Sequence, residues 1–299
     1  MSLHNLFYRV KAGMPCLVCG KPDWCMNGLE GGRYEGCCLC KRVESEHTWR
    51  DAGWFHGSPK ASDGGWERRP LRVDFGLPSR SDLLELIREA QRLVTDASLE
   101  ALSQSLQVSG QSLLRLGLGR ARGPLAASIG IRGGRAAWLF PMSSASGEIV
   151  GARVRTDDGS KFAIFGGRDG LFLPTDVQLK AARLVIAEGP SDVAALLDLG
   201  VPAIGRPSAT GGTRHLAYLA RQGKFDQIVV FGDNGAAGER GAFALATTLR
   251  LYSNDVRVVF PPSVLSDARD WVRVGGSRLE FERMVASATE LQFGGVRRV

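Results

Sequence analysis

Residues 183–192 read RLVIAEGPSD, and residues 227–238 read QIVVFGDNGAAG. Each stretch opens with a short apolar run, typical of a buried strand, and then reaches an acidic residue beside a glycine. The same pattern continues along the chain, with further strands expected at 203–204 and 255–260 and helices expected at 191–199, 213–222 and 237–251. Strands that alternate with helices in this way predict a parallel sheet covered by helices, so the fold class is α/β.

Acidic residues stand where the expected strands end. Glu188 closes the first run, Asp233 closes the second, and Asp267 comes soon after the strand at 255–260. Open parallel sheets present their ligand sites at the carboxyl ends of the strands. Carboxylates there can hold Mg²⁺, which orients phosphates for in-line displacement. Taken singly, each acid also has an ordinary structural explanation; Asp192, for example, can cap the helix that follows the first run.

A separate motif lies near the amino terminus. All the cysteines fall within residues 16–40, and they are Cys16, Cys19, Cys25, Cys37, Cys38 and Cys40. Cys16–Cys19 and Cys37–Cys40 are CxxC pairs at a spacing that suits a structural zinc site with four thiolates. Cys25 is the alternative to Cys37, and His47 and His56 are weaker candidates. Bound metal would supply most of the folding free energy of so small a module.

Aromatic and basic side chains surround these cysteines in the sequence. They are Trp24, Tyr34, Trp49 and Trp54, interleaved with Lys21, Arg33, Lys41, Arg42 and Arg50. Rings on which bases can stack, beside cations that attract phosphates, suit single-stranded nucleic acid. In a module of this size, some of the rings must instead form its core.

Between the two motifs the pattern changes twice. Residues 57–70 are rich in Gly, Ser, Pro and charge, which is typical of a linker. Helical periodicity then begins at Ser81, its expected N-cap. Further helices are expected at 99–106 and 111–116, and strands at 137–141, 149–155, 161–165 and 171–173.

Composition sets bounds on the class of protein. The chain has 299 residues, 44% of them hydrophobic, which is enough for ordinary buried cores. Lys and Arg exceed Asp and Glu by 38 to 31, and the net charge of +7 favours a polyanionic partner. No apolar stretch is long enough to span a membrane, and the first eleven residues lack a secretory pattern. We therefore expect a cytoplasmic protein with no membrane partner.

Taken together, these motifs resemble a known family. Residues 188–192 (EGPSD) look like the first motif of the TOPRIM domain, and residues 233–238 (DNGAAG) look like its second. Residues 266–271 (SDARDW) are similar to the third acidic segment, in which Asp267 is the last acid. With the cysteine module, nearly the whole chain resembles the DNA primases of phages, plasmids and other mobile elements.

The resemblance implies a small zinc-ribbon domain followed by a primase-type RNA polymerase domain, which contains a TOPRIM α/β fold with a parallel sheet. The expected divisions are a zinc-binding domain at 1–56, a linker at 57–80, the basic amino-terminal part of the polymerase domain at 81–180, the TOPRIM domain at 181–274, and a carboxyl-terminal helix and tail at 275–299.

The resemblance also implies an activity, the synthesis of short RNA primers on single-stranded DNA from nucleoside triphosphates. Glu188, Asp192, Asp233 and Asp267 would be catalytic, and all but Asp192 would bind Mg²⁺ or Mn²⁺. Arg153, Arg155 and Lys161 would contact triphosphate or template. Zn²⁺ would be structural. A replicative helicase would be a separately encoded partner, because the chain ends about thirty residues after the third motif.

One position departs from the family pattern. Where the second motif has its second Asp, this sequence has Gly235, which offers no oxygen side chain to a metal. Asn234 or Asp267 would have to compensate. A degenerate primase-like protein that binds single-stranded DNA and recruits replication proteins is therefore the alternative function, and a TOPRIM nuclease is a less favoured one.

Overall fold

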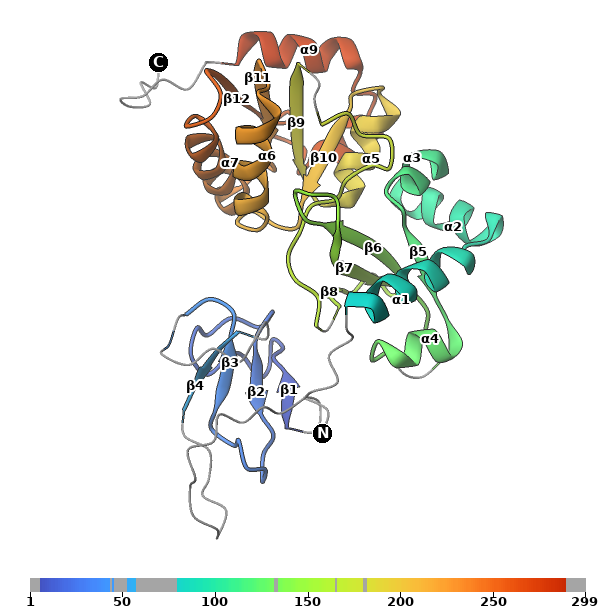
Figure 1. The fold of residues 1–299 in the computed structure, drawn as a ribbon, viewed down its shortest axis with the longest axis vertical. Coiled ribbons are helices and arrows are strands. Elements are labelled where there is room, and N and C mark those ends of the chain that lie inside the picture. Colours follow the sequence, from blue (N-terminus) through green and yellow to red (C-terminus); the bar gives the residue numbers. More distant parts are fainter. Residues whose placement is uncertain are drawn as a thin grey trace. The chain divides into compact units, whose positions relative to one another are not determined.

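The computed structural model describes residues 6–43, 45, 53–57, 80–131, 134–164, 166–179 and 182–288. The chain divides into two compact units, which are described one at a time (Figure 1). The first comprises Met1–Ser81 with Phe165–Gly167, and the second comprises Asp82–Ile164 with Arg168–Val299. His47, Trp49, Arg50 and nearly all of the expected linker and tail lie outside the described residues. The domain boundaries expected from the sequence stay predictions.

The first unit contains a four-stranded antiparallel sheet in the order β1-β2-β3-β4. Its strands are β1 Phe7–Arg9, β2 Met26–Gly28, β3 Cys38–Cys40 and β4 Trp54–His56. Side chains alternate between the two faces of a strand. Leu39 therefore packs with Phe7 and Tyr34 on one face, and its neighbours Cys38 and Cys40 lie on the other. This alternation decides which cysteines meet.

The second unit begins with an antiparallel sheet in the order β5-β6-β7-β8. Its strands are β5 Gly119–Ala121, β6 Ala137–Ser143, β7 Ile149–Thr156 and β8 Lys161–Ala163, and the helices around it are α1 Arg80–Arg92, α2 Asp96–Leu106, α3 Gly110–Arg115 and α4 Gly123–Ser128. On β7, Ala152 and Val154 pack in a core with α1 and α4. Arg153 and Arg155 therefore point to the opposite face of the sheet.

A four-stranded parallel sheet follows, in the order β10-β9-β11-β12. Its strands are β9 Arg183–Glu188, β10 Ala203–Arg206, β11 Gln227–Phe231 and β12 Asp255–Val259, and its helices are α5 Pro190–Asp198, α6 Thr213–Gly223, α7 Ala236–Leu249, α8 Ala268–Arg273 and α9 Arg278–Ser287. The expected α/β class with a parallel sheet is confirmed. No helix in the described part of the chain is both long and apolar enough to cross a membrane.

Helices cover both faces of the parallel sheet, as Figure 1 shows. On β11, Ile228 and Val230 pack with α6 and α7, whereas Val229 and Phe231 face α5, α8 and α9. Phe231 stacks on Trp271 of α8 with ring centroids 5.8 Å apart. Such aromatic pairs add about 0.5–1.5 kcal/mol to the free energy gained by burial. This contact fixes α8, whose N-cap is Asp267.

Two local expectations differ from the structure, and one helix near the acids was not predicted. The run at 171–173 is not a strand; Leu171 and Phe172 form isolated bridges to Ser143 and Gly205 and so link the antiparallel sheet to the parallel one. The first helix begins at Arg80, which places Ser81 inside its first turn and not at the N-cap. Helix α8, which the apolar periodicity did not reveal, contains only six residues.

Candidate functional site

The acids predicted from the sequence lie at the carboxyl edge of the parallel sheet. Glu188 is the last residue of β9, and Asp233 follows the neighbouring strand β11 by two residues. Asp267 is the N-cap of α8, and its Oδ1 accepts a hydrogen bond from the Asp270 N–H at 2.7 Å. With Asp192 in the first turn of α5, these residues form what we call the acidic centre.

Asp192 is the most deeply buried member of the acidic centre, with 5% of its surface exposed. It does not cap α5, because the N-cap is Gly189, whose φ of 81° lies in a region that favours glycine. The Asp192 Oδ1 instead accepts a hydrogen bond from the Arg269 N–H at 3.0 Å. Asp192 therefore ties the start of α5 to the start of α8.

Negative charge in the acidic centre is only partly neutralised. Burial, and to a lesser extent repulsion from Glu188 and Asp267, raise the pKa of Asp233 to about 7. Burial also raises the pKa of Asp192 well above its ordinary value, with Asp267 and Asp233 as the repelling neighbours. Carboxylates that raise one another's pKa values are stabilised by a nearby cation, and oxygen donors suit Mg²⁺ or Mn²⁺.

Basic side chains from the antiparallel sheet face these acids. Arg155 on β7 and Lys161 on β8 are register partners. Burial lowers the pKa of Lys161, and its cationic neighbours Arg155 and Arg269 lower it further, whereas Asp192 and Asp267 oppose the shift. The structure thus brings Lys161 near the predicted acids, with Arg155 as its register partner on β7.

The third predicted basic residue, Arg153, has a defined contact. Its Nη2 donates a hydrogen bond to the Pro207 carbonyl oxygen at 2.9 Å, just beyond the end of β10. Burial lowers the pKa of Arg153, and the charges of Asp169 and Glu188 oppose that shift. Arg153 therefore lies on the Glu188 side of the acidic centre.

Sequence reasoning missed Arg206, which is 1% exposed and is the last residue of β10. It is the register partner of Glu188, and its Nη2 lies 3.4 Å from the Glu188 Oε2. Its Nη1 donates to the carbonyl oxygens of Ala209 and Gly241 at 2.7 and 3.1 Å. The rule that selected the acids, a polar residue at the carboxyl end of a parallel strand, would also have selected this arginine.

Gly235 is the N-cap of α7 and has a φ of 105° and a ψ of 154°. A Cβ atom added there would meet no heavy atom within 4 Å, so the obstacle to a side chain is the backbone conformation, not the space. The neighbouring Asn234 is held through its side-chain nitrogen. Its Nδ2 donates to the carbonyl oxygens of Pro261, Pro262 and Leu265 at 3.1, 3.1 and 2.7 Å.

In the first unit, the sulfurs of Cys16, Cys19, Cys25 and Cys40 all lie within 4.8 Å of one another. The Cys19–Cys25 and Cys25–Cys40 sulfur distances are 3.7 and 3.9 Å. Tetrahedral zinc with Zn–S bonds of about 2.3 Å needs ligand sulfurs roughly 3.8 Å apart, so these four residues fit the ion. We call them the cysteine cluster.

The two remaining cysteines differ in position. Cys37 packs with Leu39 on the opposite face of the sheet, so the structure assembles the set that contains Cys25, the alternative to Cys37. The Cys38 sulfur lies on the cluster face, 3.2 Å from the Cys16 sulfur, although sequence reasoning gave it no role. The Nε2 of His56 forms a hydrogen bond with the Val43 carbonyl oxygen at 3.0 Å.

Comparison with solved structures finds a similar fold over about 71% of the chain. The E. coli primase catalytic core matches with a TM-score of 0.56 and 19% identity over 71% of this chain and 80% of that one. A DnaG primase catalytic domain bound to ssDNA matches with a TM-score of 0.55, 19% identity, and coverage of 71% and 82%. The zinc-binding and RNA polymerase domains of Aquifex aeolicus primase match with a TM-score of 0.57, 14% identity, and coverage of 71% and 62%.

No family model matches the sequence, and no curated protein matches it. At these identities the structural matches establish the fold alone. The protein therefore has the primase catalytic-core fold, joined in one chain to a module in which four of the six cysteines converge. The resemblance drawn from residues 188–192 and 233–238 is confirmed at the level of fold.

Proposed function

We propose that this protein is a DNA primase, which condenses nucleoside triphosphates into short RNA primers on a single-stranded DNA template. The observation that carries the proposal is the acidic centre facing Lys161 and Arg155 within a primase-core fold. Carboxylates and cations gathered in one site suit phosphoryl transfer, which depends on positioning and charge neutralisation. The DNA-bound primase domain of similar fold supports the choice of single-stranded DNA.

In this proposal, Glu188, Asp233 and Asp267 hold Mg²⁺ or Mn²⁺, which supplies Lewis-acid activation of the reacting phosphate. Lys161 and Arg155 bind the triphosphate, and among the described residues neither side chain is committed to an ion pair. Arg153 holds the loop after β10 through Pro207. Asp192 positions α8, and with it Asp267, through its bond to the Arg269 N–H.

Zn²⁺ in the cysteine cluster is part of the same proposal. Burial raises the pKa of the Cys25 thiol, and the neighbouring Cys16 and Cys19 sulfurs raise it further. A dication bound among these sulfurs would favour their thiolate forms. It would also hold the loop that carries Cys16 and Cys19 against β3, which carries Cys40. The module then contributes to the choice of template site, and a replicative helicase is the expected partner.

A priming assay tests the function. Single-stranded DNA, labelled ribonucleotides and Mg²⁺ or Mn²⁺ should give short products with the unaltered protein. We expect Glu188→Gln to lower the rate of synthesis by at least about a hundredfold, because the carboxylate is lost at constant size. Because Arg206 loses its charged partner in this variant, a melting curve must show that the variant is still folded at the assay temperature.

Asp267 offers a sharper pair of variants, because it is both an N-cap and a predicted metal ligand. Asp267→Ser keeps a capping oxygen, whereas Asp267→Ala removes it. Both should lose priming, and only Asp267→Ala should lose about 1 kcal/mol of unfolding free energy. If Asp267→Ser primes normally, Asp267 is only a cap.

Gly235 favours one second candidate, a primase-like protein without catalysis that binds single-stranded DNA and recruits replication proteins. No products with any metal, together with tight binding of single-stranded DNA, would favour this candidate over the primase.

A further inference from the structure

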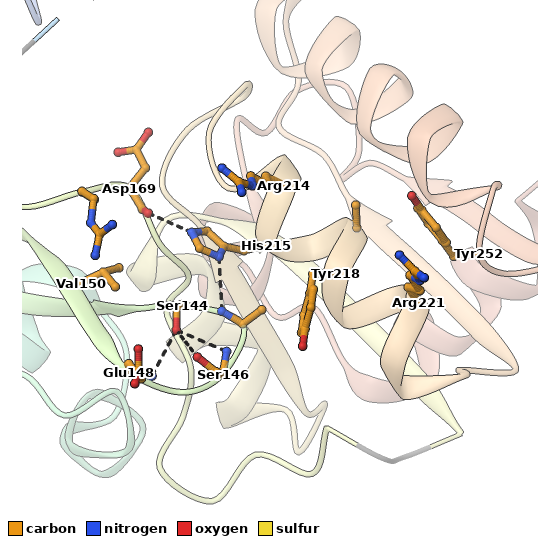
Figure 2. Close-up of a pocket in the computed structure, with 13 residues that line it drawn as sticks. Ser144, Ser146, Glu148, Val150, Asp169, Arg214, His215, Tyr218, Arg221 and Tyr252 are labelled. Atoms are coloured by element: carbon orange, nitrogen blue, oxygen red, sulfur yellow. Dashed lines mark hydrogen bonds between the residues drawn. The ribbon is translucent and has the colours of Figure 1, made fainter. Parts of the chain in front are cut away.

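A second concave surface lies on the second unit, outside the acidic centre. The cavity measures about 740 Å³ and lies between the β6–β7 turn, the segment around Asp169, helix α6 and the turn after α7. Figure 2 shows its lining side chains. The primase chemistry proposed above uses none of them.

The cavity contains a row of alternating cations and aromatic rings. Arg214, Tyr218 and Arg221 follow one another along α6, as Figure 2 shows. Spacings of four and three residues put them on the same face of the helix. Arg214 and Arg221 are separated by seven residues, or about 10.5 Å along the helix axis, so a ligand that contacts both spans about two turns of α6.

Two further residues from distant parts of the sequence extend this row. Tyr252, in the turn after α7, and Arg168, after β8, both line the cavity. Tyr218 is 53% exposed and Tyr252 is 39% exposed, so both rings are accessible to a ligand. Among the described residues, none of Arg168, Arg214 and Arg221 forms an ion pair. Their charge is therefore available to an anion.

His215 fixes the wall of the cavity. Its Nδ1 accepts a hydrogen bond from the Ala145 N–H at 3.3 Å, and its Nε2 donates to the Asp169 carbonyl oxygen at 3.2 Å. These two bonds, drawn as dashed lines in Figure 2, connect α6 to both neighbouring segments. His215 therefore holds the start of α6 against the β6–β7 turn and the segment around Asp169.

We propose that this cavity binds a short segment of single-stranded nucleic acid, with bases stacked on Tyr218 and Tyr252 and phosphates held by Arg214, Arg221 and Arg168. Exposed aromatic platforms beside a row of cations are the usual means of holding single strands without sequence preference. Two exposed rings alternating with cations in one cavity favour a strand, which has several bases and phosphates, over a mononucleotide. The inference rests on the proposed function, because a primase must hold a strand close to its acidic centre.

The cavity is connected to the acidic centre through the loop that follows β10. Arg206 ends β10 beside Glu188, Arg153 binds the Pro207 carbonyl oxygen, and α6 begins at Thr213. A strand that leaves the acidic centre over this loop reaches Arg214 first. The row along α6 then guides the strand away from the site of synthesis.

Photo-crosslinking tests the proposal on the full chain without nucleotides or added Mg²⁺. An oligonucleotide that contains 4-thiothymidine is irradiated with the protein, and the crosslinked peptides are identified by mass spectrometry. We expect crosslinks in the peptides that contain Tyr218 or Tyr252. Crosslinks confined to other peptides would overturn the proposal, and loss of these crosslinks on addition of ATP would make the cavity a mononucleotide site.

Binding measurements on variants supply the matched control. Arg214→Ala with Arg221→Ala should reduce the slope of log affinity against log salt by about 1.4, because each phosphate contact to a single strand contributes about 0.7. Arg240→Ala removes an exposed arginine of α7 that does not line the cavity, and it should have no effect. Equal slopes for the Arg214/Arg221 double variant and Arg240→Ala would contradict the inference.

The ring of Tyr218 can be tested separately from its hydroxyl. Tyr218→Ala should weaken binding of the oligonucleotide on the order of tenfold. Tyr218→Phe, which keeps the ring, should bind like the unaltered protein. If priming fails but the crosslinks remain, the proposed function is wrong and this site stands. If priming is normal and the cavity variants bind and prime like the unaltered protein, only this site is wrong.

Discussion

In the cysteine cluster, four sulfurs lie within 4.8 Å of one another at distances that suit one ion, whereas the carboxylates of the acidic centre are dispersed among four elements. Among the described residues, the cysteines form the only group of three or more metal-ligating side chains that converge so closely. The first unit has only a small hydrophobic cluster on each face of β3. The second unit has extensive hydrophobic cores on both faces of its parallel sheet.

This difference indicates two different roles for metal. In the first unit the ion would be part of the fold, because the sheet buries too few apolar residues to be stable alone. In the second unit the parallel sheet and its helices hold the acids in place against their own repulsion. Metal there would serve chemistry, and its removal should leave the fold intact.

Metal removal should therefore have the largest effect, and it should be confined to one unit. A zinc chelator should make the first unit sensitive to protease, because structural zinc supplies about 10–16 kcal/mol in comparable small modules. The helical circular dichroism, which comes from α1–α9, should persist with an unchanged melting temperature. Concerted loss of both signals would remove the distinction between the two units.

The same comparison can be sharpened at single cysteines. Cys25→Ser should abolish stoichiometric zinc binding, whereas Cys37→Ser should retain it, because the Cys37 sulfur packs on the opposite face of β3. Zinc content of the two purified variants is the measurement. The reverse result would restore the ligand set of two CxxC pairs.

Cys37 illustrates where sequence reasoning reaches its limit. The CxxC spacing predicted a metal site and its position in the chain, because that signal is local. It did not predict which sulfurs converge, because that depends on which face of β3 each residue occupies. Cys37 precedes β3 and faces the core, whereas Cys40 faces the cluster.

In the second unit, too, local patterns were predictable from the sequence and tertiary contacts were not, as Arg206 and α6 show. Apolar runs followed by acids were sufficient to predict the parallel sheet and the edge at which the acids lie. The partner of Glu188 was not predicted, since only acids were considered at the strand ends. The spacing of Arg214, Tyr218 and Arg221 is visible in the sequence, but the arrival of Tyr252 beside them depends on tertiary structure.

The acidic centre can be altered at Gly235 to test whether the missing carboxylate matters. Gly235→Asp and Gly235→Asn introduce side chains of equal size into the same strained backbone, at a cost of about 1–3 kcal/mol in each case. Their difference in priming rate therefore isolates the carboxylate. A faster rate for Gly235→Asp would show that the natural site lacks a metal ligand, and equal rates would show that the remaining acids suffice.

Asn234 should matter for stability and not as a ligand. Asn234→Ala leaves the carbonyl oxygens of Pro261, Pro262 and Leu265 without their donor, at a cost of about 1–3 kcal/mol in unfolding free energy. Urea denaturation followed by circular dichroism measures the loss. A variant of full stability whose activity needs more Mg²⁺ would instead make Asn234 a metal ligand.

The effect that needs the finest measurement is a pH dependence that metal-free carboxylates should give to the second unit. The pKa of Asp233 is raised to about 7 in the folded protein, against about 3.9 in an unfolded chain. Between these values the folded state binds more protons than the unfolded state. The contribution to stability is therefore fully present below pH 4 and is lost as the pH rises through 7, with a slope of at most about 1.4 kcal/mol per pH unit.

Asp233→Asn isolates this contribution, because it keeps the size of the side chain and removes the titration. In urea denaturation without added Mg²⁺ or Mn²⁺, the unaltered protein should lose more stability than the variant between pH 5 and pH 7.5. Added Mg²⁺ should reduce the difference, since a bound cation favours the ionised carboxylate. Identical pH profiles for the two proteins would mean that the acidic centre is not strained by its own charge, and its contrast with the cysteine cluster would then rest on geometry alone.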